Sequence, residues 1–215
     1  MSEPGLGSAN NDTGVPSPAR NPSLSRRAFL TLGARALFLV GLGGAVRLAG
    51  GRGTVLRPPG ALPGAEFLSS CIRCHKCLEV CPTGIITSVL LTEAVLGAGT
   101  PRLDFTRGYC ELCMKCAEVC TTGALVVADA GSVKLGIAHV DPENCVAWVW
   151  GGCTKCYKAC PSQAITLDEM QRPVVDVSKC NGCGTCEYVC LSTVVRSYVS
   201  TRGKGIVVRP LAGDS

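Results

Sequence analysis

The sixteen cysteines of this 215-residue chain fall into four sets of four with nearly the same spacing. Sets one, two and four read Cys-x-x-Cys-x-x-Cys-x-x-x-Cys, and set three differs only in its first interval, which holds seven residues. Three closely spaced thiolates can bind one face of a four-iron cluster, while the fourth binds the neighbouring cluster. The spacing therefore predicts four 4Fe-4S clusters. The predicted ligands are Cys71, Cys74, Cys77 and Cys81; Cys110, Cys113, Cys116 and Cys120; Cys145, Cys153, Cys156 and Cys160; and Cys180, Cys183, Cys186 and Cys190.

Two other uses of cysteine fit this pattern less well. Disulfides need Cα atoms about 4.4–6.8 Å apart with converging side chains, which cysteines crowded at such short intervals do not readily meet. Structural zinc usually takes two pairs of ligands separated by a longer loop. Iron-sulfur clusters that carry electrons are the favoured interpretation, and no residue pattern of a substrate-transforming site accompanies them.

The N-terminal segment predicts export. Ser25-Arg26-Arg27-Ala28-Phe29-Leu30 precedes an apolar run at 36–46 and resembles a twin-arginine signal, and the polar leader before it is too rich in Pro, Ser, Asn and Gly to fold. The apolar run is shorter than the roughly 20 residues of a spanning helix. No good cleavage site follows, so both cleavage and retention as an N-terminal anchor stay open.

Repeated phrases after the cysteine sets divide the rest of the chain. We expect a disordered leader and signal at 1–49, an extended strap at 50–66, a four-cluster domain at 67–198 and a C-terminal tail at 199–215. The fold class is α+β, built of tandem bacterial-ferredoxin-like repeats. The spacers after sets three and two each predict two short strands, at 164–168 with 173–177 and at 124–128 with 136–140. The first spacer predicts a helix at 86–96, and the last interval of each cysteine set predicts one helical turn.

Several residues beside the ligands are candidates for supporting roles. His75 lies inside set one and His139 on an expected strand, and both are interpreted as bystanders. Trp148 and Trp150 are expected to shield a cluster in preference to docking a partner. Glycines next to ligands, Gly152, Gly182 and Gly184, are expected to let the backbone approach a cluster and donate N–H groups to sulfur.

The strap Arg-Pro-Pro-Gly-Ala-Leu-Pro at 57–63, the stretched third set and the twin-arginine motif resemble NapG, the ferredoxin-type protein of periplasmic nitrate reductase systems, and its counterpart MauN in methylamine utilisation. The resemblance implies four 4Fe-4S clusters and a quinol dehydrogenase role with a membrane polyferredoxin. One departure is set two, which is more compact than in NapG and lacks the following proline. That departure leaves the terminal acceptor open.

The residues leave open which fourth cysteine serves which cluster. Sets could exchange their fourth cysteines in sequence, one with two and three with four. The likeness of this family to the beta subunits of dimethyl sulfoxide reductase-type enzymes instead favours nesting, in which Cys190 completes the first cluster, Cys160 the second, Cys120 the third and Cys81 the fourth.

The predicted function is that of a periplasmic electron-transfer subunit. It would work between a quinol-oxidising membrane protein and a periplasmic reductase or cytochrome, with no nucleic-acid partner, because no basic run interleaved with aromatics occurs. Two alternatives stay open: the beta-type subunit of a molybdoenzyme, and an assembly factor without redox turnover. The sequence does not give the direction of electron flow or the cluster potentials.

Overall fold

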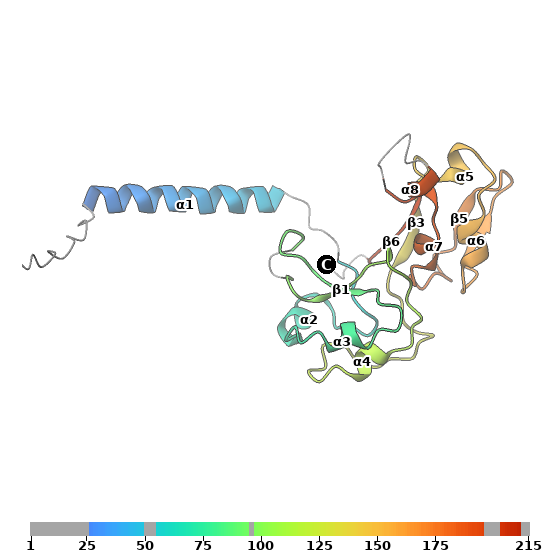
Figure 1. The fold of residues 1–215 in the computed structure, drawn as a ribbon, viewed down its shortest axis with the longest axis horizontal. Helices are drawn as coiled ribbons and strands as arrows, with labels where there is room; N and C mark the ends of the chain where they lie inside the picture. The colour runs from blue at the N-terminus through green and yellow to red at the C-terminus, as the bar shows by residue number, and fades with distance from the viewer. Residues whose placement is uncertain (1–25, 50–54, 95–96, 196–202, 212–215) are drawn as a thin grey trace, which may run out of the picture. The chain divides into compact units, whose positions relative to one another are not determined.

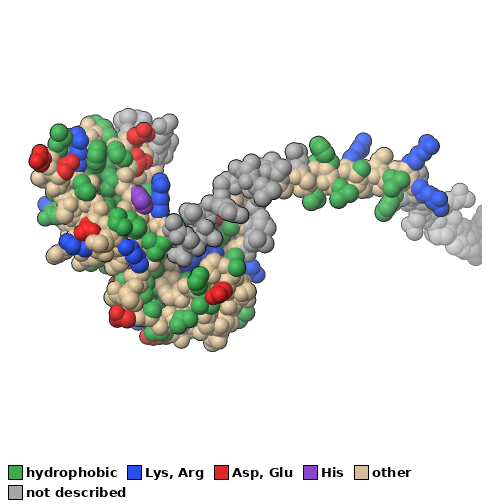
Figure 2. Space-filling model, turned by 180° about the vertical axis from the view of Figure 1, so that it is seen from behind, with side chains coloured by type: hydrophobic (Ala, Val, Ile, Leu, Met, Phe, Trp, Pro, Cys, Tyr) green, Lys and Arg blue, Asp and Glu red, His purple; other side chains and the backbone are tan. Residues whose placement is uncertain are grey.

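The computed structural model describes residues 26–49, 55–94, 97–195 and 203–211 (Figure 1). The chain divides into two compact units, residues 1–51 and 52–215. The described part of the first unit is one 24-residue helix, α1 (Arg26–Ala49), which begins at the two arginines of the predicted export motif. Its large apolar side chains between Phe29 and Val40 are exposed, and Arg26 and Arg27 lie at its start (Figure 2). No helix in the described ranges has both the length and the apolar character needed to cross a membrane.

The second unit is built from short elements that alternate with loops. Its helices are α2 (Gly64–Ser70), α3 (Lys76–Glu79), α4 (Lys115–Glu118), α5 (Val146–Val149), α6 (Lys155–Ala159), α7 (Thr185–Tyr188) and α8 (Ser192–Val195). Its strands are β1 (Ile86–Ser88), β2 (Pro101–Leu103), β3 (Ile137–Val140), β4 (Ile165–Leu167), β5 (Pro173–Val175) and β6 (Ile206–Arg209). The predicted helical turn within the cysteine sets is confirmed by α4 and α7.

The described strands form three antiparallel pairs, β1–β2, β4–β5 and β3–β6. The pair predicted within 164–177 is confirmed, because Ile165 lies opposite Val175 and Leu167 opposite Pro173. Each pair is only three or four residues long, so it is marginal alone and depends on packing against the rest of the unit.

The helix predicted at 86–96 is wrong. Residues 86–88 form strand β1, whose Ile86 lies opposite Leu103, and the pairing continues where the Val89 N–H donates to the Thr100 carbonyl at 2.8 Å. Only a single turn follows, in which Ala94 donates to Leu90. The apolar character of this segment is explained by the burial of Ile86 and Val89 against the core. The segment begins with β-branched residues, which favour a strand.

Two further predictions are wrong because the strands pair with residues far away in the chain. Residues 124–128 do not pair with 136–140; instead Leu125 bridges Ala61 of the strap, and β3 pairs with β6. The C-terminal tail predicted at 199–215 therefore contributes a strand to the domain. Of the strap predicted at 50–66, residues 50–54 lie outside the described ranges, residues 55–63 contain no helix, and α2 begins at Gly64.

The core is small and includes cysteines. Phe67, Ile85, Phe105 and Ile206 are almost completely buried, and they belong to the same buried cluster as several of the ligand cysteines. Those core cysteines are Cys116, Cys156, Cys180 and Cys186. The apolar packing and the candidate ligands are thus one structure, and loss of either affects the other.

The loops between ligands adopt left-handed backbone conformations at matching positions. In set one these are Arg73 and His75, in set two Leu112 and Met114, and in set four Gly182 and Gly184, with φ from 55° to 81°. Helices α3, α4 and α7 each begin directly after the second of these residues. The left-handed residues curl the chain around the thiols, at a cost of roughly 1–2 kcal/mol for each residue other than glycine.

Gly184 and Gly151 have the same left-handed backbone conformation but differ in the room available for a side chain. Alanine substitutions at the two positions therefore separate the effect of backbone strain from that of steric overlap. Their φ angles are 81° and 79°, but a Cβ on Gly184 would overlap the ring of Phe105, whereas a Cβ on Gly151 meets nothing within 4 Å. We expect Gly151→Ala to lower the free energy of unfolding by about 1–2 kcal/mol through strain alone. Gly184→Ala is expected to lower it by about 1–3 kcal/mol more through overpacking. Denaturant unfolding of the anaerobically purified variants measures both, and equal losses would contradict the steric argument.

Candidate iron-sulfur site

The structure brings the cysteines together in groups of four. Three such groups line cavities. We define group A as Cys71, Cys74, Cys77 and Cys120, group B as Cys81, Cys110, Cys113 and Cys116, and group D as Cys160, Cys180, Cys183 and Cys186. In each, three thiols come from one set and the fourth from the neighbouring set.

The remaining cysteines form group C, which consists of Cys145, Cys153, Cys156 and Cys190. Burial is the main cause that raises the pKa of Cys156 to about 12, and the thiolates of Cys145, Cys153 and Cys190 add to it. Cys190 and Cys145 are also linked through the C-terminal segment, because Gly205 packs against the Cys145 backbone and donates its N–H to Ser192, two residues after Cys190. The stretched interval of set three, which contains α5, thus still delivers Cys145 to a group of four.

The grouping shows that fourth cysteines are exchanged between neighbouring sets. Sets one and two exchange Cys81 and Cys120, and sets three and four exchange Cys160 and Cys190. The nested plan is therefore wrong. Its physical reason is local packing: α3 lies against α4 and α6 against α7, so the cysteine that follows each short helix faces the set beside it (Figure 1).

The donor sets fit a multi-iron cluster better than a single ion. All sixteen cysteines are free thiols, and nowhere in the described residues do three His, Cys, Asp or Glu side chains approach closely enough to hold one metal ion. Four thiols placed around a cavity can instead each bind one iron of a 4Fe-4S cluster.

The fourth cysteine of every set has a hydroxyl two residues later. The Sγ–Oγ distances are 3.5 Å for Cys81–Thr83, 3.7 Å for Cys120–Thr122, 3.7 Å for Cys160–Ser162 and 3.2 Å for Cys190–Ser192. Backbone N–H groups also reach these sulfurs, since Leu125 donates to Cys120 at 3.4 Å and Ala164 to Cys160 at 3.3 Å. Such hydrogen bonds stabilise a thiolate and raise the potential of a cluster that it binds.

Third and fourth cysteines differ in their electrostatics. Burial, followed by neighbouring thiolates, raises the pKa of Cys116 to about 12, and burial is also the main cause that raises the pKa of Cys77 to about 11. For Cys81 burial acts in the same direction, but the Thr83 hydroxyl and nearby backbone N–H groups outweigh it and lower the pKa. The pKa of Cys120 is lowered against burial in the same way, by Leu125 N–H and Thr122. Hydrogen bonds thus favour the thiolate form of Cys81 and Cys120, whereas burial favours the neutral form of Cys77 and Cys116.

The structure places the two histidines and the two tryptophans that were candidates for supporting roles in different environments. His75 lines the group A cavity, but its Nε2 lies 3.1 Å from the Gly99 carbonyl oxygen, so its ring is tied to the protein; His139 is exposed on β3. Trp148 lies half-buried under the Arg172 guanidinium, 4.8 Å from the ring centre, and its shielding of a cluster stays a prediction. Trp150 is 53% exposed, which does not fit a shielding role.

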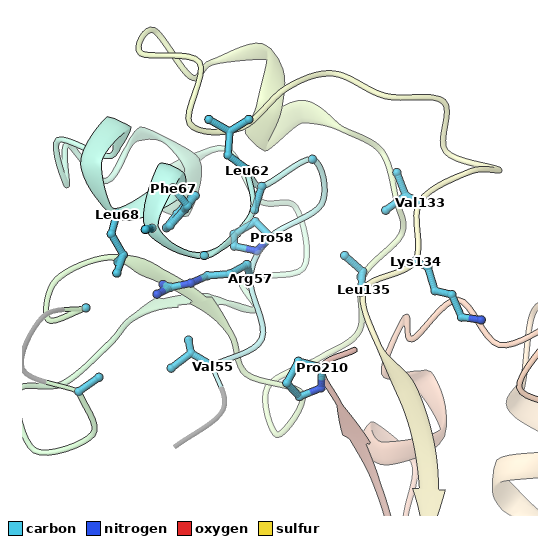
Figure 3. A pocket seen from close by; sticks show the side chains of 16 residues that line it. Val55, Arg57, Pro58, Leu62, Phe67, Leu68, Val133, Lys134, Leu135 and Pro210 are labelled. Carbon is cyan, nitrogen blue, oxygen red and sulfur yellow. The ribbon is translucent and has the colours of Figure 1, made fainter. Parts of the chain in front are cut away.

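A cavity of about 410 Å³ has no cysteine in its lining. Residues of the strap and α2 line it, among them Arg57, Pro58, Leu62 and Phe67, together with residues of later segments such as Leu135 and Pro210 (Figure 3). The Arg57 guanidinium lies 4.7 Å from the centre of the Phe67 ring and donates to Thr100 Oγ1 at 2.7 Å and to the Pro101 carbonyl. The charged head of this arginine therefore fastens the strap to β2.

Comparison with known proteins agrees with this geometry. The family described as the 4Fe-4S dicluster domain matches residues 70–124 and 151–194. The first stretch holds all cysteines of groups A and B, and the second holds those of groups C and D except Cys145, which the long interval places outside it. The fold and the thiol groups define a ferredoxin-type electron-transfer protein that binds 4Fe-4S clusters.

Similar proteins with known names indicate which family of ferredoxin-type proteins the chain belongs to. The chain is 37% identical to the methylamine utilization ferredoxin-type protein MauM of Methylophilus methylotrophus, over 72% of this chain and 74% of the relative. It is 36% identical to the ferredoxin-type protein NapG of Escherichia coli, over 81% and 85%. It is 34% identical to MauM of Methylorubrum extorquens, over 80% and 87%. The chain belongs to the family of NapG and MauM ferredoxin-type proteins; the methylamine-utilisation relatives are named MauM, where the sequence interpretation named MauN.

Sequence reasoning missed the hydroxyls beside the fourth cysteines. The signal was present, because Thr83, Thr122, Ser162 and Ser192 occupy the same position of the repeated phrase. A serine or threonine in a loop is too common to single out, and only the distance to sulfur gives it a role.

Ser192 offers a direct test of that role. Its hydroxyl is buried and accepts the Gly205 N–H at 2.7 Å, so its own proton is available to Cys190 Sγ. We expect Ser192→Ala to lower the reduction potential of the cluster at group C by about 20–60 mV, the equivalent of one hydrogen bond. The unpaired Gly205 N–H should also lower the free energy of unfolding by about 1–3 kcal/mol.

Potentiometric titration followed by electron paramagnetic resonance measures the shift. Ser192→Thr keeps a hydroxyl and should restore the potential, and Thr122→Ala, at the exposed hydroxyl 3.7 Å from Cys120, should change its own cluster less. An unchanged potential in a destabilised Ser192→Ala protein would limit Ser192 to a structural role.

Proposed function

We propose that this protein is an exported carrier of four 4Fe-4S clusters. In this proposal it belongs to a quinol dehydrogenase module and passes electrons from membrane quinol towards a periplasmic reductase. The observation that carries the proposal is the arrangement of all sixteen cysteines in four groups of four, with none left over. Four cofactor positions within one small unit suit stepwise electron transfer, and the family of NapG and MauM supports the same role.

The proposed ligands follow the groups. Cys71, Cys74, Cys77 and Cys120 would hold one cluster, and the members of groups B, C and D one each. The bound clusters supply one-electron redox chemistry. The protein's own part is to supply thiolates, to donate hydrogen bonds to them from N–H and hydroxyl groups, and to keep water from the buried thiols of groups B, C and D.

Export before electron transfer is the second part of the proposal. Arg26 and Arg27 are exposed at the beginning of α1, and the twin-arginine route transports folded proteins, which suits clusters inserted in a reducing compartment. The proposed partners are a quinol-oxidising membrane polyferredoxin on one side and a periplasmic reductase or cytochrome on the other.

Cluster content and partners together test this function. Anaerobic purification from periplasmic and membrane fractions should yield about sixteen iron and sixteen sulfide per chain, as four cubanes require, with a polytopic membrane protein. Reduction of the clusters by quinol should require that protein. A soluble catalytic subunit in its place would favour the beta-subunit alternative. Clusters that quinol never reduces, with the membrane partner present, would favour the assembly factor.

Exchange of both arginines tests the export route. The variant Arg26→Lys/Arg27→Lys keeps the charge of the segment but removes the paired guanidinium groups, so we expect most of the cluster-loaded protein to stay in the cytoplasm. Arg35→Lys, on the same helix, is the matched control and should be exported normally. Immunoblots of cell fractions give the result, and normal export of the double variant would reject the twin-arginine route.

A further inference from the structure

We propose that electrons cross between the two halves of the domain through a contact between a ligand of group B and a ligand of group D. The four clusters then form a single line in the order A, B, D, C, with groups A and C at its ends. This inference rests on the proposed function, because it requires all four clusters, and it adds the order of transfer, which sequence spacing does not give.

The contact that joins the halves is a backbone hydrogen bond. The N–H of Cys110 donates to the carbonyl of Cys183 at 2.8 Å. Cys110 lines the group B cavity and Cys183 lines the group D cavity. A short path of bonded atoms and one hydrogen bond therefore leads from an iron ligand in the first half to an iron ligand in the second.

The neighbours within each half follow from the exchanged cysteines. Groups A and B share sets one and two, and the helices that carry their third cysteines, α3 and α4, pack together. Groups C and D share sets three and four in the same way through α6 and α7. Since A adjoins B, B adjoins D and D adjoins C, these contacts join the four groups in one line.

The junction between B and D is closely packed. Gly182 and Gly184 flank Cys183; a Cβ on Gly182 would overlap the backbone of Gly136, and one on Gly184 the buried Phe105 ring. The Leu135 N–H donates to the Asn181 carbonyl at 2.9 Å and fixes the same loop. Close packing here keeps the two groups at a constant separation and excludes water, which favours transfer between them over transfer to solvent.

Each transfer is a one-electron exchange in which no bond is broken. A reduced cluster loses one electron and returns to its oxidised state, and the next cluster in the line gains that electron. In the proposed module the membrane partner oxidises a quinol to a quinone, which releases two protons to the solvent and two electrons that enter the line one at a time. An oxidised periplasmic carrier removes the electrons at the other end. In this order the two interior clusters, at B and D, would not need to exchange electrons directly with either partner.

Removing one cluster at a time tests the order. Cys113→Ser targets interior group B and Cys74→Ser targets end group A; both cysteines are exposed and occupy the same position in their sets. Full-length protein is reduced with dithionite, and magnetic coupling between clusters is measured by electron paramagnetic resonance. We expect Cys113→Ser to leave one uncoupled signal, from group A, beside a coupled pair. Cys74→Ser should leave three coupled clusters and no isolated signal.

Two outcomes would overturn the order: an uncoupled cluster in Cys74→Ser, or persistent coupling of every cluster in Cys113→Ser. Iron analysis should give about twelve atoms per chain in each variant, four fewer than in the unchanged protein. If Cys113→Ser does not fold, Cys183→Ser removes the other interior cluster and should isolate group C while A and B stay coupled. Fewer than four clusters in the unchanged protein would reject the proposed function, whereas four clusters with a different coupling pattern would reject only the order.

Discussion

The exchange of fourth cysteines between neighbouring sets is the constraint on which the rest of the structure depends. Because Cys81 belongs to group B and Cys120 to group A, neither group can close without the other set, and the same holds for Cys160 and Cys190. Each half thus depends on two cysteine sets at once, and buried cysteines form part of its core. The short strands and one-turn helices would be marginal alone, and they are placed by the thiol groups that they surround.

The sequence could predict those features of the structure that depend on the spacing of residues close together in the chain. The three neighbouring cysteines of each group, the strand pair β4–β5 and the helical turn before a fourth cysteine all follow from residues close together in the chain. The partner of each fourth cysteine depends on which helices pack side by side, and spacing does not contain that information. The nested plan came from a resemblance, and the packing of α3 on α4 overrides it. The strand β6 was missed because its partner, β3, lies more than sixty residues earlier.

The left-handed backbone conformations beside the cysteines could not be predicted from the sequence either. Glycine at 182 and 184 could suggest a special conformation, but Arg73, His75, Leu112 and Met114 take the same left-handed conformation with ordinary side chains. The strained turn brings three thiols to one side. A cluster bound to these thiols would offset the free-energy cost of the strain. His75 also gains a contact to the Gly99 carbonyl that helps to hold its unfavourable conformation.

The C-terminal segment has a consequence for the timing of assembly. Strand β6 pairs with β3, Gly205 packs on Cys145 and binds Ser192, and Val208 donates its N–H to Glu187 on α7 at 2.7 Å. These residues follow all sixteen cysteines along the sequence, so they are synthesised after the four cysteine sets. The surroundings of group C are therefore complete only after Arg209 has been made. A product terminated between Cys190 and Gly205 would contain every cysteine but would lack the contacts that Gly205 makes with Cys145 and Ser192.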